Sequence, residues 1–308
     1  MGSQHDIADL LRWDTDGAVR EESHARLIAD ERFAHAARAL ARNMLAAGAA
    51  DKALDGVFKD AGRYVAALWA IYLHVSGGLT LPRLKEICAS SGFVSPGRAR
   101  ALLLYLRYLG YIRLLPVKAQ GEPNRYTPTP SLMRVWRSHL GAALEAASLA
   151  EPAVRLVLDR LDEPQVFETF SKLHGAGLLT SARGVDQNAA FIRVFMHRHA
   201  GNQIVFTLVA EDDEVFPPQR PLPVSIAATA RRFHVSRIHI KRLLDEAEQE
   251  GLLKYDPEGA IVLQEAARAE ICFSYSVQLV QLIVAAARTV SERPDLFAAK
   301  SWGEAVRA

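Results

Sequence analysis

Cysteine is scarce in this chain, with two residues among 308. Cys88 and Cys272 each lie inside an apolar helical pattern without Cys or His at ligand spacing, so neither a disulfide framework nor a zinc site is expected. No uninterrupted apolar run reaches the length of a transmembrane helix, and the first residues lack the basic and apolar regions of a secretory signal. We therefore expect a cytoplasmic protein that needs no metal or cofactor.

An excess of charge of one sign is also missing, since 37 Lys and Arg residues balance 35 Asp and Glu residues for a formal net charge of +2. Only the distribution of charge can therefore indicate a nucleic-acid partner. A phosphate-binding loop, a supported Ser, His and Asp arrangement and paired carboxylates are absent as well. His197 and His199 are two residues apart, which points them to different sides of a helix and does not suit a metal. The sequence predicts that the protein is not an enzyme.

Helix-forming periodicity fills most of the chain, half of whose residues are hydrophobic. Segments rich in β-branched residues are brief, so a mainly α fold is predicted. The expected helical regions are 5–50, as two amphipathic helices with the second ending at Gly48, then 57–75, 131–174 with breaks at Pro152 and Pro164, 188–209 as one long helix, and roughly 264–291.

An internal repeat is the most informative feature of the sequence. Four landmarks recur at an offset of 141 positions without any gap. They pair Leu81-Pro82 with Leu222-Pro223, Val94-Ser95 with Val235-Ser236, Leu103 with Leu244, and Gly110 with Gly251. Each glycine is followed by two apolar residues and a basic one. Landmarks that share one register indicate a duplicated structural unit.

The second copy has the pattern of two short helices and a β-hairpin. Ser236 stands where an N-cap opens a helix over 237–249, and Gly251 ends that helix. A hairpin with its turn at 256–259 follows. Four apolar residues of the second helix share one face at helical spacing, and we expect them in the core: Ile240, Leu243, Leu244 and Ala247.

The first copy repeats this pattern with a longer hairpin. Ser95 is the matching cap, and the strands expected at 111–115 and 124–127 flank a turn-rich tip. The helix that Ser95 opens has an equivalent apolar face: Ala99, Leu102, Leu103 and Leu106. Two helices joined by a tight turn and followed by a hairpin describe a winged helix-turn-helix, so two such units in tandem are predicted, packed with long connecting helices.

Both units resemble the winged helix-turn-helix of bacterial transcription regulators. The shared pattern, from Val-Ser through Leu-Leu to Gly and two apolar residues, is similar to that of the MarR-type group and covers about residues 60–130 and 190–265. The resemblance implies that the second helix of each unit enters the major groove of double-stranded DNA while the wing contacts the flanking backbone. MarR-type proteins pair one winged helix per subunit by homodimerisation, whereas this chain carries two.

Basic residues gather at the positions that this docking requires. The acidic residues of the second helix come late, at Asp245, Glu246, Glu248 and Glu250, which leaves its N-terminal half basic. The predicted DNA contacts are Ser95, Arg98, Arg100, Lys118 and Arg125 in the first unit and Ser236, Arg237, His239, Lys241 and Arg242 in the second.

The two units are predicted to differ in how they contact DNA. The first reading helix exposes apolar and small residues that suit thymine methyl groups or a protein interface: Gly97, Ala101, Leu104, Tyr105 and Tyr108. Its wing is long and basic. The second helix is polar and basic, but its wing tip carries Asp256 and Glu258, which phosphates repel.

The sequence thus divides into an N-terminal helical segment (1–56), a first winged helix (57–130), a helical connector (131–187), a second winged helix (188–265) and a C-terminal helix and tail (266–308). We expect a sequence-specific transcriptional regulator acting as a pseudo-dimer of its two winged helices. A replication initiator and a winged-helix protein-interaction scaffold without DNA binding are the alternatives. A homodimer or protein partner through the helical segments stays open.

A small-molecule site between the helices is a further alternative. The aromatic residues of the amphipathic helices are instead expected to be core or subunit contacts: Tyr64, Trp69, Tyr72, Phe273 and Tyr275.

Overall fold

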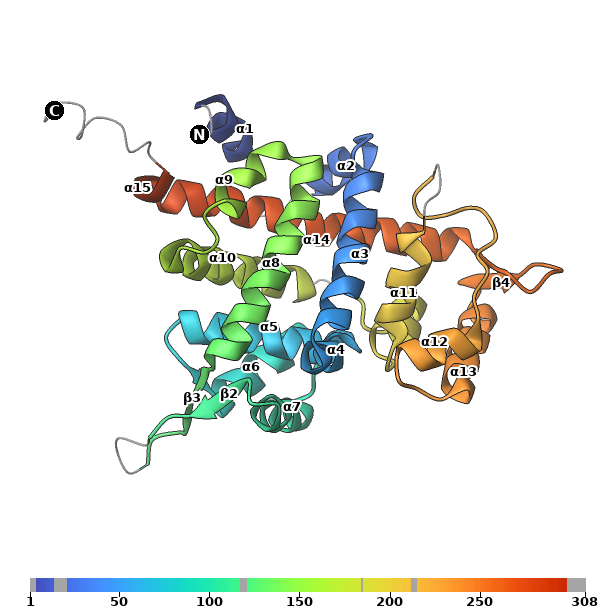
Figure 1. Cartoon of the computed structure of the whole chain (residues 1–308), viewed down its shortest axis with the longest axis horizontal. Helices are drawn as coiled ribbons and strands as arrows, with labels where there is room; N and C mark the ends of the chain where they lie inside the picture. The colour runs from blue at the N-terminus through green and yellow to red at the C-terminus, as the bar shows by residue number, and fades with distance from the viewer. Residues whose placement is uncertain (1–3, 14–20, 117–120, 184, 212–214, 298–308) are drawn as a thin grey trace, which may run out of the picture.

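Helices and short strands alternate along the computed structural model, which describes residues 4–13, 21–116, 121–183, 185–211 and 215–297. These residues form a mainly helical protein with two small antiparallel sheets (Figure 1). The predicted mainly α class is therefore confirmed. Buried side chains from both repeated units and from the helices between them join one hydrophobic core.

The first repeated unit places three strands beside three helices. Its elements are α5 (Ala61–Val75), β1 (Leu79–Thr80), α6 (Leu81–Ser91), α7 (Pro96–Tyr108), β2 (Ile112–Leu114) and β3 (Arg125–Pro128). The strands pair in the order β1-β3-β2, with Leu79 opposite Tyr126. Gly92, at φ 75°, ends α6 in a left-handed conformation that glycine adopts without strain, and this turn sets the direction of α7.

The second repeated unit follows the same order of elements. It comprises α11 (Gly201–Ala210), α12 (Ile226–Arg232), α13 (Arg237–Gln249), β4 (Leu253–Tyr255) and β5 (Ile261–Leu263). A bridge between Leu222 and Ile261, with reciprocal backbone hydrogen bonds of 2.8 Å, stands where the first unit has β1. The bounds of α13 agree with the predicted helix, and both predicted hairpins are present.

Four long helices carry these units, and shorter elements fill the gaps. The long helices are α3 (Phe33–Ala50), α8 (Pro130–Ala150), α10 (Pro164–Arg183) and α14 (Glu265–Glu292). The shorter elements are α1 (Gln4–Leu11), α2 (Glu21–Ala29), α4 (Lys52–Phe58), the 3-10 turn η1 (Pro152–Val154), α9 (Arg155–Leu158), the π-helical turn η2 (Ile192–Met196) and α15 (Pro294–Phe297). The predicted breaks at Pro152 and Pro164 are confirmed, since each proline begins a new element.

The long helices pack in a reciprocal arrangement. α3 packs against α8, and α10 packs against α14. The opening helix of each unit crosses to the other pair, because α5 packs against α10 and α11 packs against α3. At the first crossing, a Cβ added to Gly175 of α10 would lie 2.7 Å from the ring of Tyr72, so glycine permits this close approach. The first unit is thus anchored by α10, and the second unit is anchored by α3.

The single long helix predicted over 188–209 is wrong. The chain forms η2, a turn and then α11, which begins at Gly201. Ala200 adopts a left-handed φ of 63°, and Gly201 lies against the carbonyl oxygen of Phe195, where no Cβ fits. The spacing of apolar residues does not reveal this backbone break, because buried residues such as Phe195 and Ala200 lie on both sides of it.

The predicted boundaries near the N-terminus need two corrections. The described residues between 5 and 50 form three helices rather than two, namely α1, α2 and α3. The helix end predicted at Gly48 is also wrong, because α3 continues to Ala50 and Gly48 lies inside it against α4. A Cβ at Gly48 would meet Asp55 at 3.4 Å and Phe58 at 3.7 Å, so this glycine is a packing position rather than a helix stop.

α14 has the length and hydropathy of a membrane span by composition alone, and it is the one such helix among the described residues. Its most apolar window is 56% buried inside the fold. α14 crosses the molecule beside α3 and α8 in Figure 1 and packs on both, as the core helix of a helical protein does.

Candidate nucleic-acid interface

α7 and α13 begin in the same way, with a serine that caps the first turn. Ser95 Oγ accepts from the backbone N–H of Arg98 at 3.3 Å, and Ser236 Oγ accepts from that of His239 at 3.1 Å. Both predicted N-caps are confirmed. The hydroxyls are committed to helix backbone, so each cap fixes where its helix starts and which side chains stand on the first turn.

The two helices are fixed to the core by equivalent apolar faces. The eight predicted core residues are all buried: Ala99, Leu102, Leu103 and Leu106 on α7, and Ile240, Leu243, Leu244 and Ala247 on α13. At helical spacing, this burial leaves the opposite face of each helix outward. The chemistry of those outward faces therefore decides what each helix can bind.

α7 presents a mixed outward face. Arg100 and Arg107 are exposed and have no ion-pair partner within the described part of the chain. Leu104 is 47% exposed and Tyr108 is 86% exposed, so apolar surface lies between the two guanidinium groups. The face is basic without being strongly charged.

Arg98 does not project from α7 but turns back to the core. Its Nη2 donates to Oδ1 of buried Asp60 at 2.9 Å. Asp60 also caps α5, accepting from the backbone N–H of Arg63, and pairs with the Arg63 side chain at 3.2 Å. Burial alone would raise the pKa of Asp60, but His199, the Arg63 N–H and the charges of Arg98 and Arg63 outweigh it and hold that pKa below its ordinary value. Asp60 is therefore an ionised anchor for the start of α7.

α13 presents a more polar outward face that is basic over its first half. Arg237 and Arg242 are exposed without an ion-pair partner among the described residues, and Ile238 between them is 64% exposed. Lys241 Nζ lies 2.7 Å from Oδ2 of Asp245, an exposed pair one turn apart on the same helix. Such surface pairs are weak, so a phosphate can compete for the lysine.

His239 occupies the position in α13 that Arg98 occupies in α7, and it also turns inward. Its Nε2 lies 2.6 Å from the carbonyl oxygen of His199. His199 Nδ1 in turn lies 4.0 Å from Oδ2 of Asp60, and the next residue, Ala200, donates its N–H to the carbonyl of Lys59 at 2.8 Å. Equivalent positions on the two helices thus converge on one junction between the halves of the molecule.

A second set of ion pairs holds the acidic end of α13. Arg198 pairs with Glu246 at 2.6 Å, and Arg193 pairs with Glu250 at 2.9 Å. The late acidic residues of α13, predicted only to leave its start basic, therefore also dock the helix on the η2 region. Sequence patterns did not identify Asp60, Arg193 or Arg198 as positioning residues, because their partners are 38 to 57 residues away in the chain. Asp60 carries a local signal, since a helix N-cap is readable from sequence.

The first wing carries two of the predicted DNA contacts, and the second wing carries an acidic tip. Arg125 is exposed on β3 and reaches the carbonyl of Gly77 at 3.4 Å, while Lys118 lies outside the described residues. In the second wing, the Asp256 carboxylate accepts from the backbone N–H groups of Glu258 and Ala260 at 3.0 and 2.7 Å. The acidic residue at that tip is thus part of the turn itself, an arrangement typical of Asp in tight turns.

The two candidate helices lie on one side of the molecule. Figure 1 shows α7 and α13 at the lower edge with the β2-β3 hairpin beyond α7, while the hairpin that begins with β4 projects to the right, above α13. α1 and α2 lie at the opposite edge.

Comparisons of the chain with models of protein families, with curated proteins and with solved structures found no match.

Proposed function

We propose that this protein is a sequence-specific DNA-binding transcriptional regulator of the cytoplasm, in which two winged helix-turn-helix units on one chain act as a pseudo-dimer. The order helix, strand, helix, turn, helix, hairpin in the first unit supports the winged-helix assignment, and the second unit keeps this order with a single bridge in place of the first strand. α7 and α13 are the reading helices of this proposal.

The reciprocal packing of the long helices is the observation that carries the proposal. In each unit the opening helix packs on a long helix outside that unit, α5 on α10 and α11 on α3. A contact in which equivalent surfaces exchange partners is the signature of an approximate two-fold axis. Such an axis presents two reading helices to successive turns of one face of a DNA duplex, as symmetric dimers do with two chains.

The charge on the reading helices supports DNA as the partner. Arg100, Arg107, Arg237 and Arg242 are exposed on α7 and α13, and no acidic residue lies on α7. Exposed arginine suits both phosphate contacts and bidentate contacts to guanine. The proposed base readers are Arg100, Arg237, Lys241 and Arg242, while Arg98 and His239 position the helices from within.

Exposed apolar side chains on the same helices favour a second candidate, a protein-interaction scaffold. Leu104 and Tyr108 on α7 and Ile238 on α13 expose apolar surface where a partner protein can pack. A scaffold of this kind would not bind duplexes through its arginine residues, so a DNA-binding experiment separates the two functions.

The test is selection of bound duplexes from a random pool, followed by fluorescence anisotropy at two salt concentrations. We expect an asymmetric site with two different half-sites, because the exposed residues of α7 and α13 differ. Affinity should fall about a hundredfold between about 50 and 200 mM salt if four phosphates are contacted. Arg12→Ala is the control, since Arg12 is an exposed arginine directly after α1, and α1 lies at the opposite edge. Failure to enrich any duplex would contradict the proposal and favour the scaffold.

A further inference from the structure

A cavity of about 360 Å³ lies between the two halves of the molecule, away from the candidate DNA edge. α3, α5 and α8 line it from the first half, and α10, η2, α11 and α14 line it from the second. Its volume falls within the range of protein sites for small organic molecules. Tyr64, Trp69 and Phe273, expected from sequence to be core or subunit contacts, all line this cavity.

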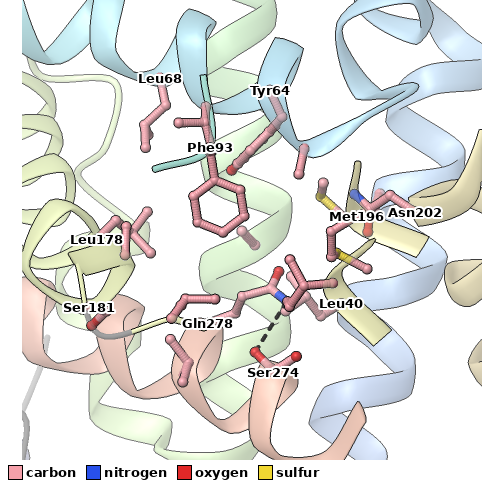
Figure 2. A pocket seen from close by; sticks show the side chains of 18 of the residues that line it. Leu40, Tyr64, Leu68, Phe93, Leu178, Ser181, Met196, Asn202, Ser274 and Gln278 are labelled. Carbon is pink, nitrogen blue, oxygen red and sulfur yellow. Dashed lines mark hydrogen bonds between the residues drawn. The ribbon is translucent and has the colours of Figure 1, made fainter. Parts of the chain in front are cut away.

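The cavity wall is largely apolar, with a few polar groups. Figure 2 shows Phe93 projecting among Leu68, Leu178 and Leu40, with Ser274 and Gln278 of α14 on another side. Gln278 Nε2 is only weakly engaged, donating to the Ser274 carbonyl at 3.3 Å. This combination of an apolar wall with isolated polar side chains is typical of a small-molecule site.

Two buried polar atoms of the lining residues have no hydrogen-bond partner among the described residues. They are Nδ1 of His174 and Nε1 of Trp69. Burial of an unpaired polar group costs free energy, and such groups are rare in a folded interior. Both atoms lie beneath the cavity surface, so they add to the polarity of the wall and do not contact a molecule in the cavity directly.

The charge of the lining residues decides the class of molecule. No Lys or Arg is present among the lining residues that the structure describes. The acidic lining residues are Asp186, which is exposed, and Glu270, which is half-buried. Burial lowers the pKa of His139 to about 3 and that of His174 to about 4, so both imidazoles are neutral at neutral pH. An anion would find no countercharge inside.

We propose that this cavity binds an uncharged, largely aromatic small molecule, and that its occupancy changes the relative position of α7 and α13. Binding follows from the cavity itself, whereas an effect on transcription rests on the proposed function.

The route from cavity to helices runs through two segments. Phe93 lies in the turn between α6 and α7, two residues before the cap of α7, and its ring centroid is 5.9 Å from that of His197. Met196 and Asn202 line the cavity on either side of the loop whose Arg198 and His199 hold α13. A molecule in the cavity therefore touches the supports of both reading helices at once.

Two dyes with the same ring system test the binding and its charge preference. N-phenyl-1-naphthylamine is uncharged, and 1-anilinonaphthalene-8-sulfonate adds one sulfonate. Titrated into the protein without DNA, the uncharged dye should show saturable fluorescence enhancement, and the sulfonate should bind at least tenfold more weakly. Equal binding of both dyes, or no saturable binding of the uncharged dye, would overturn the proposed site.

Matched substitutions on α10 locate the dye. Leu178 lines the cavity, whereas Leu179, its half-buried neighbour, does not. Leu178→Trp should weaken binding of the uncharged dye at least tenfold, and Leu179→Trp should leave it unchanged. If the Leu178 variant loses its helical circular dichroism, the smaller change Ser274→Val, which removes a polar group of the wall, takes its place. Unchanged binding in a folded cavity variant would assign the dye to another surface.

Spin labels test the conformational effect without DNA. Labels at Tyr108→Cys on α7 and Arg242→Cys on α13, in a Cys272→Ser background, report the separation of the two helices, while native Cys88 is buried. Saturating uncharged dye should shift the distance distribution, and Leu178→Trp should abolish the shift. An unchanged distribution with dye bound would overturn the coupling. Neither dye fluorescence nor the spin-label distance depends on DNA. Failure of DNA binding would therefore contradict the proposed function and leave the cavity proposal standing.

Discussion

The two units are built on one plan but differ at nearly every exposed position of their reading helices. The core residues of α7 coincide with those of α13 at the repeat offset, so Ala99 matches Ile240 and Leu103 matches Leu244. The outward residues have diverged, with Gly97 opposite Ile238 and Arg100 opposite Lys241. Packing constrains the first set, since a buried face tolerates only apolar residues of suitable volume. The second set is free to specialise in different partners.

One position on each helix, Arg98 on α7 and His239 on α13, has diverged in residue type but has kept its structural role. Arg98 and His239 differ in size and charge, yet both reach the same junction around Asp60 and His199. The two units therefore keep a shared support while exposing different side chains. Four experiments can break or sharpen this comparison.

The largest effect is expected from α13. Arg237→Ala combined with Lys241→Ala should abolish preference for the selected half-site, at about 1–3 kcal/mol for each base-reading side chain. Both residues are exposed and lie off the buried face, so the helical content should not change. Competition anisotropy between selected and scrambled duplexes measures the effect. Arg100→Ala on α7 should cost less, because apolar residues share that face. If the α13 pair retains full preference, α13 is not the dominant reader.

Acid should destabilise both halves together. The pKa values of His139 on α8 and His174 on α10 are lowered by burial to about 3 and about 4, so protons bind mainly to the unfolded chain. Stability is then complete above about pH 6.5 and is lost as pH falls toward 4, by about 2 kcal/mol per histidine at about pH 5.

Urea unfolding at several pH values measures this loss. His174→Gln should reduce the slope of stability against pH, whatever it does to stability at neutral pH. Since the two histidines belong to opposite halves of one core, a single transition should persist throughout. Two separate transitions would show that the units are independent domains and would break the pseudo-dimer comparison.

Two glycines on the long helices give a smaller contrast. Gly175→Ala on α10 forces a Cβ to 2.7 Å from the Tyr72 ring at the crossing with α5, so we expect a loss of about 1–3 kcal/mol. Gly48→Ala on α3 meets its neighbours at 3.4 Å or more, and replacing a helical glycine there should be neutral or stabilising by up to about 1 kcal/mol. Thermal unfolding compares them. Equal effects would mean that the crossing relaxes easily.

The periodic spacing of apolar residues predicts one part of this fold and misses another. The caps Ser95 and Ser236, the bounds of α13 and all eight core positions were predictable, because each depends on residues within one or two turns. The break before Gly201 was not, since it depends on Ala200 adopting a left-handed conformation and on contact with Phe195.

The candidate site was predicted in part for the same reason. The exposure of Arg100, Arg237 and Arg242 follows from the apolar stripes of their own helices. The inward turn of Arg98 and His239 does not, because Asp60 and His199 come from distant segments that only the crossing helices bring together. The spacing of apolar residues within one helix does not predict ion pairs or cavities formed with distant segments.

The smallest effect distinguishes the ion pairs that support the two reading helices. Asp60→Asn keeps an N-cap acceptor for α5 but removes the charge that holds Arg98. Because Arg98 is half-exposed, solvent screening limits the expected loss to about 1 kcal/mol at neutral pH. The pKa of Asp60 is held low, so this contribution is present above the ordinary Asp range and disappears as pH falls through the folded pKa.

Asp245→Asn on α13 is the matched substitution, because it breaks the exposed pair with Lys241. Exposed pairs contribute little, so stability should be unchanged, while the freed Lys241 should strengthen DNA binding and steepen its salt dependence. Asp60→Asn should act in the opposite sense, lowering stability and weakening mainly the half-site read by α7, since Asp60 contacts Arg98 of that helix directly and α13 only through His199. Urea unfolding and anisotropy on duplexes with one half-site scrambled separate these effects. Equal responses of the two half-sites to Asp60→Asn would mean that the junction supports both helices alike.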